Sequence, residues 1–241
     1  TEAVKHLLIL NIIFFAASSF MGDNLGSWLA LYFPKNEHFG AWQFVTHMFM
    51  HGGLMHIAFN MYALWAVGSP LEQMWGRNKF FFFYFSAGIG AGLIYTGVKY
   101  LQFNGIYNDL VQLGMQSAEI QSLLETGRYN SNILNSINEN RLMEIYQIYN
   151  TPAVGASGAI YGVLVAFGMT FPNAKLALIF LPVPIAAKYF IPVLIALDLF
   201  SGVTGFSIFG GGIAHFAHVG GALIGFIMMK YWEKNQFKRW N

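Results

Sequence analysis

The chain has 241 residues, of which 56% are hydrophobic and only 10% charged, with a formal net charge of +2 and no cysteine. Soluble domains carry about 25% charged residues, so this composition excludes a fully water-exposed surface and indicates a membrane protein. The lack of cysteine excludes disulfides, thiol nucleophiles and cysteine metal sites. No basic cluster with interleaved aromatic residues reaches outside the membrane, so we expect no nucleic acid partner.

Hydrophobic residues gather in six runs, most of them close to the roughly 20 residues that a helix needs to cross a bilayer. We therefore expect an all-α, polytopic membrane protein with six transmembrane helices and a single domain over residues 1–241. The expected helices cover residues of about 5–21, 50–71, 80–101, 152–171, 186–199 and 212–232. No Ala-x-Ala cleavage pattern follows the first run, so we interpret it as a span and not as a signal peptide.

The distribution of basic residues predicts the orientation. With both termini in the cytoplasm, the inner side holds Lys5, Arg77, Lys79, Lys175, Lys188, Lys230, Lys234, Lys238 and Arg239. The outer side then holds only Lys35, Lys99, Arg128 and Arg141. This excess of inner charges fits the positive-inside rule and predicts a multi-pass protein of the cell membrane, surrounded by lipid.

The first outer loop, residues 22–49, is amphipathic and rich in aromatic side chains, with a turn at residues 34–37. Such a segment is expected to lie in the membrane interface. An aromatic belt that anchors the protein at headgroup depth is at least as good an interpretation as a role in substrate binding.

The second helix carries His51, His56 and Asn60. His56 and Asn60 are four residues apart and so share one helix face. Polar groups are costly inside hydrocarbon unless they pair or line a wet cavity. This helix alone leaves two interpretations open: a polar cavity, or a hydrogen-bonded pair that holds two helices together.

The third helix has a small-residue surface at residues 88–92, which predicts close helix packing and no chemistry. It is followed by an insertion, residues 102–151, that is rich in Asn, Gln and Ser. Apolar residues recur there at nearly helical spacing, so we expect part of it to form an amphipathic helix outside the membrane. Its role as a lid, a docking surface or a passive elaboration stays open.

The fourth helix carries Gly155 and Ser157 near its start, and Tyr161 one turn later. The sixth helix enters from the same outer side and carries His218, so the serine and the histidine should lie at similar depth. Glycines four residues apart on each helix, at 158/162 and at 221/225, should let the two backbones approach closely. The Gly-rich stretch before the sixth helix, residues 201–212, is expected to be a mobile cap.

Alone, the Gly-x-Ser-Gly motif is more often packing than catalysis, and no strand pattern supplies the elbow of an α/β-hydrolase. Together with His218, Ser157 is a candidate nucleophile with the imidazole as its base. We expect a dyad without a third acidic member, because Asp198 lies near the expected far end of the fifth helix. Tyr161 is placed to stack on the imidazole of His218.

Acyl transfer also needs hydrogen-bond donors for the tetrahedral oxyanion. His56, Asn60 and the backbone N–H of Ser157 are the candidates. The other histidines raise the question of a metal, and His215 is a second candidate base. We expect no metal and no cofactor, because the chain has no His-Glu-x-x-His and no carboxylate was expected beside these histidines.

These motifs together resemble the rhomboid intramembrane serine proteases. The resemblance rests on three motifs: His-x-x-x-x-His-x-x-x-Asn at His51, His56 and Asn60; Gly-x-Ser-Gly-x-x-Tyr at Gly155, Ser157 and Tyr161; and Ala-His-x-x-Gly-x-x-x-Gly from Ala217 to Gly225. It covers about residues 5–232 apart from the insertion. It also favours His218 over His215 as the base, because the glycines at 221 and 225 fix the match.

The resemblance implies a six-helix rhomboid fold in which Ser157 and His218 cleave single-pass transmembrane proteins near the outer face. His56 and Asn60 would lie in the oxyanion site, with His51, Gly155 and Tyr161 in support. The chain has Gln43 where the family often has Arg after Trp, which questions the usual polar anchoring of the first loop. The insertion is also longer than in compact bacterial members.

The same motifs leave two other function classes as alternatives. One is a non-catalytic rhomboid-fold protein that binds membrane clients, although such relatives typically lack the serine or the histidine. The other is a transporter or channel, which is disfavoured because the chain has no duplicated half and no polar residues that continue to the inner side.

Overall fold

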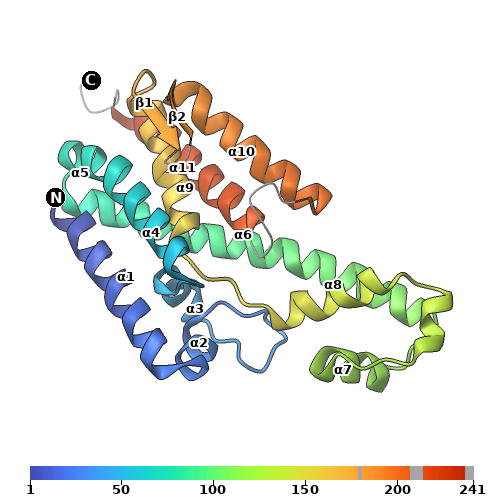
Figure 1. Ribbon diagram of the computed structural model, residues 1–241. Helices are drawn as coiled ribbons and strands as arrows, with labels where there is room; N and C mark the ends of the chain where they lie inside the picture. The colour runs from blue at the N-terminus through green and yellow to red at the C-terminus, as the bar shows by residue number, and fades with distance from the viewer. Residues whose placement is uncertain (179–180, 207–213, 237–241) are drawn as a thin grey trace.

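The computed structural model describes residues 1–178, 181–206 and 214–236 and is mainly helical (Figure 1). The elements in chain order are α1 (Glu2–Met21), α2 (Asp23–Leu29), α3 (Gln43–Thr46), the 3-10 turn η1 (His47–Phe49), α4 (Leu54–Ala63), the π-helical turn η2 (Leu64–Gly68), α5 (Ser69–Trp75), α6 (Arg77–Gln112), α7 (Ser117–Thr126), the 3-10 turn η3 (Ser131–Asn135), α8 (Glu139–Asn150), α9 (Ser157–Thr170), β1 (Lys175–Leu178), β2 (Leu181–Ala186), α10 (Ala187–Thr204) and α11 (His215–Gln236).

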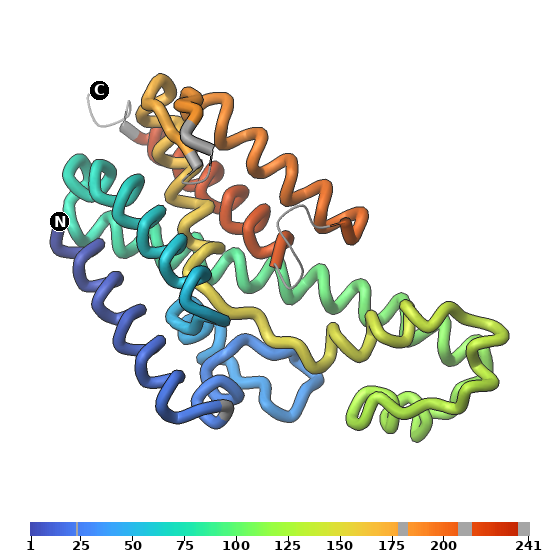
Figure 2. The backbone as a smooth tube through the Cα atoms, in the orientation of Figure 1, coloured from blue at the N-terminus to red at the C-terminus, as the bar shows by residue number. Residues whose placement is uncertain are grey.

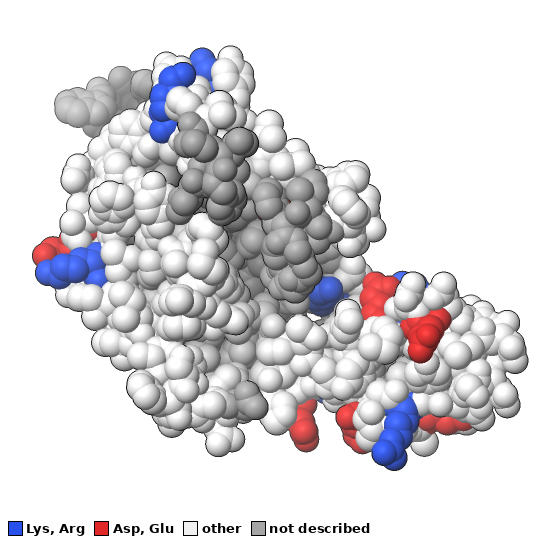
Figure 3. All heavy atoms as spheres, in the orientation of Figure 1, with Lys and Arg blue, Asp and Glu red and all other residues white. Residues whose placement is uncertain are grey.

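Several helices suit a membrane. Among the described residues, α1, α6 and α10 are long and apolar enough to cross a bilayer, and α9 is a shorter apolar helix. Exposed apolar side chains occur on the outside of the bundle, for example Ile12, Ile13, Leu93, Val193 and Ile227. On the face in Figure 3, charged side chains gather at the edges of the bundle and on the insertion, with a broad uncharged area between them. These features support a polytopic membrane fold, while the number of six spans remains a prediction.

The second expected span is built from three pieces, α4, η2 and α5, that follow one another without a break. Pro70 comes just after the π-helical turn, and a proline has no N–H to donate to the carbonyl four residues earlier. A local change from the α to the π pattern is one way in which a helix accommodates such an interruption. In the last piece of this span, α5, both carboxylate oxygens of Glu72 accept backbone N–H groups of α1, from Ala3 at 2.7 Å and from Val4 at 2.9 Å.

The helix bounds differ from the expected ones at several ends, and three of these differences affect the site and its surroundings. Helix α6 continues to Gln112, well past residue 101, and α10 continues to Thr204 and not only to residue 199. Helix α9 begins at Ser157 and not at residue 152, because the preceding residues are extended and pair with the first loop. Ser157 is therefore the first residue of its helix, and Gly155 lies before the helix and not within it.

The inner loop after α9 is not purely irregular. Strands β1 and β2 pair antiparallel, with Lys175 opposite Ala186 and Leu176 opposite Ile185. A short connection that reverses direction places its two halves next to each other, so their backbones can form the hydrogen bonds of a β-hairpin. The strictly all-α expectation is corrected by this small hairpin.

The centre of the bundle is the packing of α6, α9 and α11. A Cβ atom added to Gly221 would lie 1.8 Å from the carbonyl oxygen of Gly158, and one added to Gly225 would lie 2.6 Å from the Cα of Gly162. The expected close approach of the two glycine-bearing helices is thus confirmed. On the other side, Ala87 and Ala91 of α6 contact the same helix, α9.

The insertion forms a second apolar core beyond the bundle. Helix α7 starts with a capping box between Gln116 and Glu119, and the Asn138 side chain caps α8. The core combines one residue of the first loop with the far end of α6 and with α7 and α8: Phe33, Phe103, Ile106, Leu110, Met115, Ile120, Leu123, Leu124, Leu142, Ile145 and Ile148. Figure 2 shows the chain turning back from the far end of α6 through α7 and α8 toward α9.

Candidate active site

Ser157 is held in place by the segment before it. The backbones of Leu31 and Ala153 exchange two hydrogen bonds, of 2.9 and 2.8 Å, and the N–H of Gly155 donates to the carbonyl of His47 at 2.9 Å. The first outer loop therefore fixes the two residues on the approach to the serine. Because each contact is made by backbone atoms, the geometry depends on the path of the loop and only indirectly on its side chains.

Gly155 has a backbone conformation that suits glycine alone. Its φ angle is +124°, where residues with a Cβ are strained. A Cβ at this position would lie 2.8 Å from Nε2 of His56 and 3.5 Å from Oγ of Ser157. The missing side chain keeps the space between the imidazole and the serine hydroxyl free.

The structure brings Ser157 and His218 together. Nε2 of His218 lies 2.8 Å from the serine Oγ, within hydrogen-bond reach of a base and its nucleophile. The ring of Tyr161 stacks on the imidazole, with centroids 4.3 Å apart and planes 12° from parallel. The stacked ring limits the rotation of His218 about its side chain, while the glycine contacts of α9 and α11 set the distance between the two helices.

The expectation that no acid reaches this pair is wrong. Oδ1 of Asp198 lies 3.1 Å from Nδ1 of His218 and 2.6 Å from Nδ1 of His215, and its other carboxylate oxygen accepts the hydroxyl of Tyr161. Asp198 is only 3% exposed. Because α10 continues to Thr204, Asp198 is an interior residue of that helix and its side chain reaches across to α11.

Gln43 takes over the polar anchoring of the first loop. It is fully buried, and its side-chain N–H groups donate to the carbonyls of His38 at 2.7 Å and Trp28 at 3.2 Å. Its Oε1 accepts the N–H of Tyr32 at 3.1 Å. An amide can both donate and accept, so one neutral side chain joins three backbone segments where an arginine could only donate.

The second helix presents His56 toward the serine. The N–H of Gly52 points to Nδ1 of His56 at 3.3 Å, so the neutral imidazole accepts at Nδ1 and carries its proton on Nε2, the atom that faces Gly155. Asn60 donates to the carbonyl of His56 within its own helix, at 2.8 Å. The ring of His51 packs edge-on against that of His56, with centroids 5.0 Å apart.

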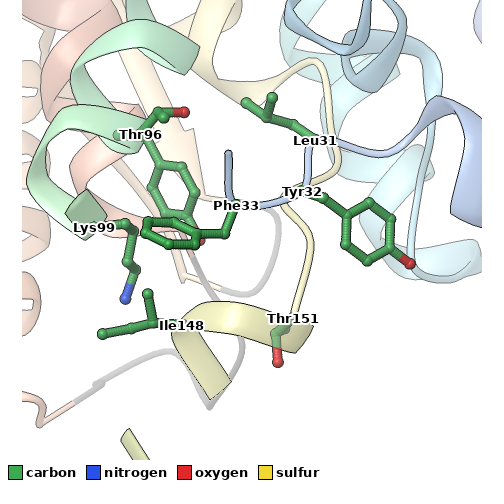
Figure 4. Close-up of a pocket in the computed structure, with 8 residues that line it drawn as sticks. Leu31, Tyr32, Phe33, Thr96, Lys99, Ile148 and Thr151 are labelled. Atoms are coloured by element: carbon green, nitrogen blue, oxygen red, sulfur yellow. The ribbon is translucent and has the colours of Figure 1, made fainter. Parts of the chain in front are cut away.

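A small cavity of about 10 Å³ lies beside the Leu31–Ala153 bridge (Figure 4). It is lined by the first loop, by α6 and by the end of α8: Leu31, Tyr32, Phe33, Tyr95, Thr96, Lys99, Ile148 and Thr151. Its volume suits about one water molecule, so it is a packing junction and not a substrate site. It marks the place where the insertion meets the segment that leads to Ser157.

The expected mobile cap and His47 are the last two features of the sequence to be compared with the structure. Half of the Gly-rich stretch expected to act as a mobile cap, residues 207–212, lies outside the described part of the chain. Its first four residues, 201–204, form the last turn of α10 and not a loop. His47, one of the other histidines, has Nδ1 at 2.7 Å from the carbonyl of Gln43, so it belongs to the support of the first loop.

Comparisons with known proteins agree with these motifs. The rhomboid domain family matches residues 38–234. Rhomboid protein 1, mitochondrial, of Saccharomyces cerevisiae is 27% identical over 186 residues, which are 77% of this chain and 40% of that protein. The presenilin-associated rhomboid-like protein, mitochondrial, of Bos taurus is 31% identical over 184 residues, 76% of this chain and 36% of that protein.

A bacterial relative matches a shorter stretch. Rhomboid protease GlpG of Photorhabdus laumondii is 30% identical over 110 residues, which are 44% of this chain and 38% of that protein. The chain thus spans well under half the length of these curated relatives. Since the family match covers most of the chain, including all three motifs, the chain belongs to the rhomboid family.

Proposed function

We propose that this protein is an intramembrane serine endopeptidase that cleaves transmembrane-anchored proteins near the outer face of a membrane. The observation that carries the proposal is the 2.8 Å contact between Nε2 of His218 and Oγ of Ser157, at the start of an apolar helix. The names of the bacterial relatives, which are called rhomboid proteases, point in the same direction.

In the proposed reaction, Oγ of Ser157 attacks the scissile carbonyl while Nε2 of His218 takes the hydroxyl proton. The new imidazolium then gives this proton to the leaving amine, and water repeats the sequence on the acyl-enzyme. Asp198 accepts from Nδ1 of His218, which holds the proton of the neutral ring on that atom and leaves Nε2 free to act as the base. The carboxylate also stabilises the imidazolium that forms during attack.

The developing oxyanion has donors on two sides of Gly155. The first backbone N–H groups of a helix have no partner within it and carry the positive end of the helix dipole. Among the described residues, no side chain caps the start of α9, so these N–H groups are not engaged by a capping side chain. Nε2–H of His56 faces the same space. Asn60 is proposed to assist through its remaining amide N–H, each such donor being worth about a hundredfold or more in rate.

Membrane lipids and single-pass transmembrane proteins are the proposed partners, and the reaction needs neither a metal nor a cofactor. The proposed orientation has both termini in the cytoplasm and the site open to the outer side of the membrane. In the fold, the first turn of α9 and the end of the bundle that holds the start of α1 lie apart (Figure 1), as this orientation requires.

The proposal is tested with the purified full chain in proteoliposomes that contain a single-pass transmembrane substrate. Wild type should cleave the substrate and react with a fluorophosphonate probe, and Ser157→Ala should lose both properties. Thr170→Ala, which removes a hydroxyl at the other end of the same helix, is the matched control and should keep both. Cleavage by Ser157→Ala at the wild-type rate would rule the proposal out.

A further inference from the structure

His215 is a buried histidine without a role in the proposed reaction. It is 9% exposed, and its Nδ1 lies 2.6 Å from the same oxygen of Asp198 that accepts from His218. Two imidazole nitrogens and one carboxylate oxygen therefore converge, all within 4.8 Å of one another. The prediction of no metal rested on the lack of a carboxylate beside these histidines, and the position of Asp198 removes that reason.

The charges around Asp198 favour a cation. Its partners among the described residues are two imidazoles and the hydroxyl of Tyr161, and none of these carries a permanent positive charge. A buried carboxylate within a membrane protein is costly unless a cation balances it. Two histidines and one carboxylate are a common donor set for Zn²⁺, which leaves a fourth position for water.

We propose that Asp198, His215 and His218 form an inhibitory Zn²⁺ site. The metal would bind the Nδ1 atoms of both histidines and a carboxylate oxygen of Asp198. Each Nδ1 atom now lies at hydrogen-bond distance from the same carboxylate oxygen, at 2.6 and 3.1 Å, and the candidate ligand atoms lie within 4.8 Å of one another. Movements of these side chains would open a space in which zinc meets all three at the 2.0–2.2 Å bond lengths that it requires. Residues from α10 and α11 would then share one metal.

Binding at Nδ1 would switch the base off. A metal on Nδ1 uses the lone pair of that nitrogen, so the proton of the neutral ring moves to Nε2 in both histidines and no net proton is released. Nε2 of His218 is the atom next to the Ser157 hydroxyl. As an N–H group it donates to the serine and cannot accept its proton, so the first step of acyl transfer stops.

The first experiment measures binding without catalysis. Zn²⁺ alone is titrated calorimetrically into the full-length Ser157→Ala chain in detergent, and Co²⁺ is used as a visible-spectrum probe of a tetrahedral site. We expect one equivalent of metal. Adding His215→Asn, which keeps an N–H hydrogen-bond donor near the position of Nδ1 but removes the imidazole ligand, should weaken binding more than tenfold. Even a residue that only hydrogen-bonds to a ligand contributes about 10- to 100-fold to metal affinity. His38→Asn, which replaces a half-exposed histidine, should change nothing.

A second ligand variant, His218→Asn, guards against a folding defect of one variant and should weaken binding to a similar extent. No stoichiometric binding, or binding that neither ligand variant weakens, overturns the site. These titrations do not depend on protease activity, so they can succeed even if the proposed function fails.

The second experiment tests inhibition and rests on the proposed function. Zn²⁺ should inhibit wild-type cleavage over the same concentration range as it binds, and a chelator should restore the rate. The activity that remains in His215→Asn should lose at least tenfold in zinc sensitivity. Binding without inhibition would overturn the inhibitory part of the proposal, whereas no cleavage in metal-free buffer would instead count against the proposed function.

Discussion

At the scale of single residues, Asp198 has the largest effect on how the site is interpreted. It accepts hydrogen bonds from Tyr161, His215 and His218, and so ties the fourth, fifth and sixth expected helices together. In the proposed reaction Asp198 would orient the base and make no contact with the substrate, so we treat it as a positioning residue. It turns the expected dyad into an arrangement with three members.

Asp198→Asn should lower kcat by roughly 10²- to 10⁴-fold, because an amide can present its N–H to Nδ1 and stabilise the wrong tautomer of His218. KM should stay close to wild type, and the rate of fluorophosphonate labelling should fall together with kcat. A variant that loses only thermal stability while kcat is kept would show that Asp198 has a structural role alone.

The candidate nucleophile and base could be predicted from sequence because their neighbours are glycines at helical spacing, which constrain both depth and distance. Asp198 could not, for two physical reasons. Helix α10 is apolar around most of its circumference, so hydropathy does not show which face points inward. The helix ends at Gly205, whose φ of +74° is typical of a glycine at a helix end. The sequence has several glycines after residue 199, however, and does not show which of them ends the helix.

Gln43 anchors the first loop through three hydrogen bonds of one neutral amide. Gln43→Met keeps the approximate volume but removes these bonds; the Trp28 carbonyl still accepts from Nε1 of Trp42 at 2.9 Å, whereas the His38 carbonyl loses the bond that Gln43 gives it. A buried polar group that loses its hydrogen bond costs about 1–3 kcal/mol. We expect the first loop to exchange amide hydrogens faster and kcat to fall, whereas Gln112→Met, at an exposed position, should match wild type in both measurements.

At the scale of helices, the contact of α9 and α11 sets the geometry of the site. Gly221→Ala places a methyl group against the backbone of Gly158, and we expect a loss of about 3 kcal/mol or more because two backbones must separate. Gly97→Ala, in α6, meets nothing within 4 Å and should stay within about 1 kcal/mol of wild type. Unfolding followed by circular dichroism in detergent distinguishes them, and equal midpoints for both variants would contradict the backbone contact.

Helix ends were the least predictable feature of the fold. Hydropathy locates apolar runs well, but α9 starts late because the residues before it pair with the first loop. The extension of α6 into the insertion was missed because its outer part is polar enough to look like a loop. In both cases the decisive contacts are between segments far apart in sequence.

At the scale of the whole molecule, the insertion packs against the two chain segments that lead to the candidate active site, the first loop and the residues just before Ser157. Its core includes Phe33 of the first loop, and the Asn36 side chain donates to the carbonyl of Tyr149 at 2.8 Å. If α8 becomes less stable, local unfolding should therefore increase at residues 31–33 and 151–156 before it increases in the bundle.

Ile145→Ala removes a fully buried side chain of that core and should destabilise the insertion by about 2–5 kcal/mol. Hydrogen exchange followed by mass spectrometry should show faster exchange in the first loop and in residues 148–156, with α11 unchanged. Met143→Ala, on the exposed side of the same helix, is the control. If only α7 and α8 respond to Ile145→Ala, the insertion is mechanically separate from the active site.

The π-helical turn at Leu64–Gly68 acts as an angular offset within one span. The wider turn accommodates one extra residue, so each side chain beyond it takes the place that the preceding residue would have in a regular α-helix, a change of about 100°. His56, before the turn, faces the serine, and Glu72, after it, faces the start of α1. If the same residues formed a regular α-helix, one of these two side chains would point about 100° away from its partner. Deleting one residue from the turn, in contrast, should make the helix regular and leave both directions unchanged.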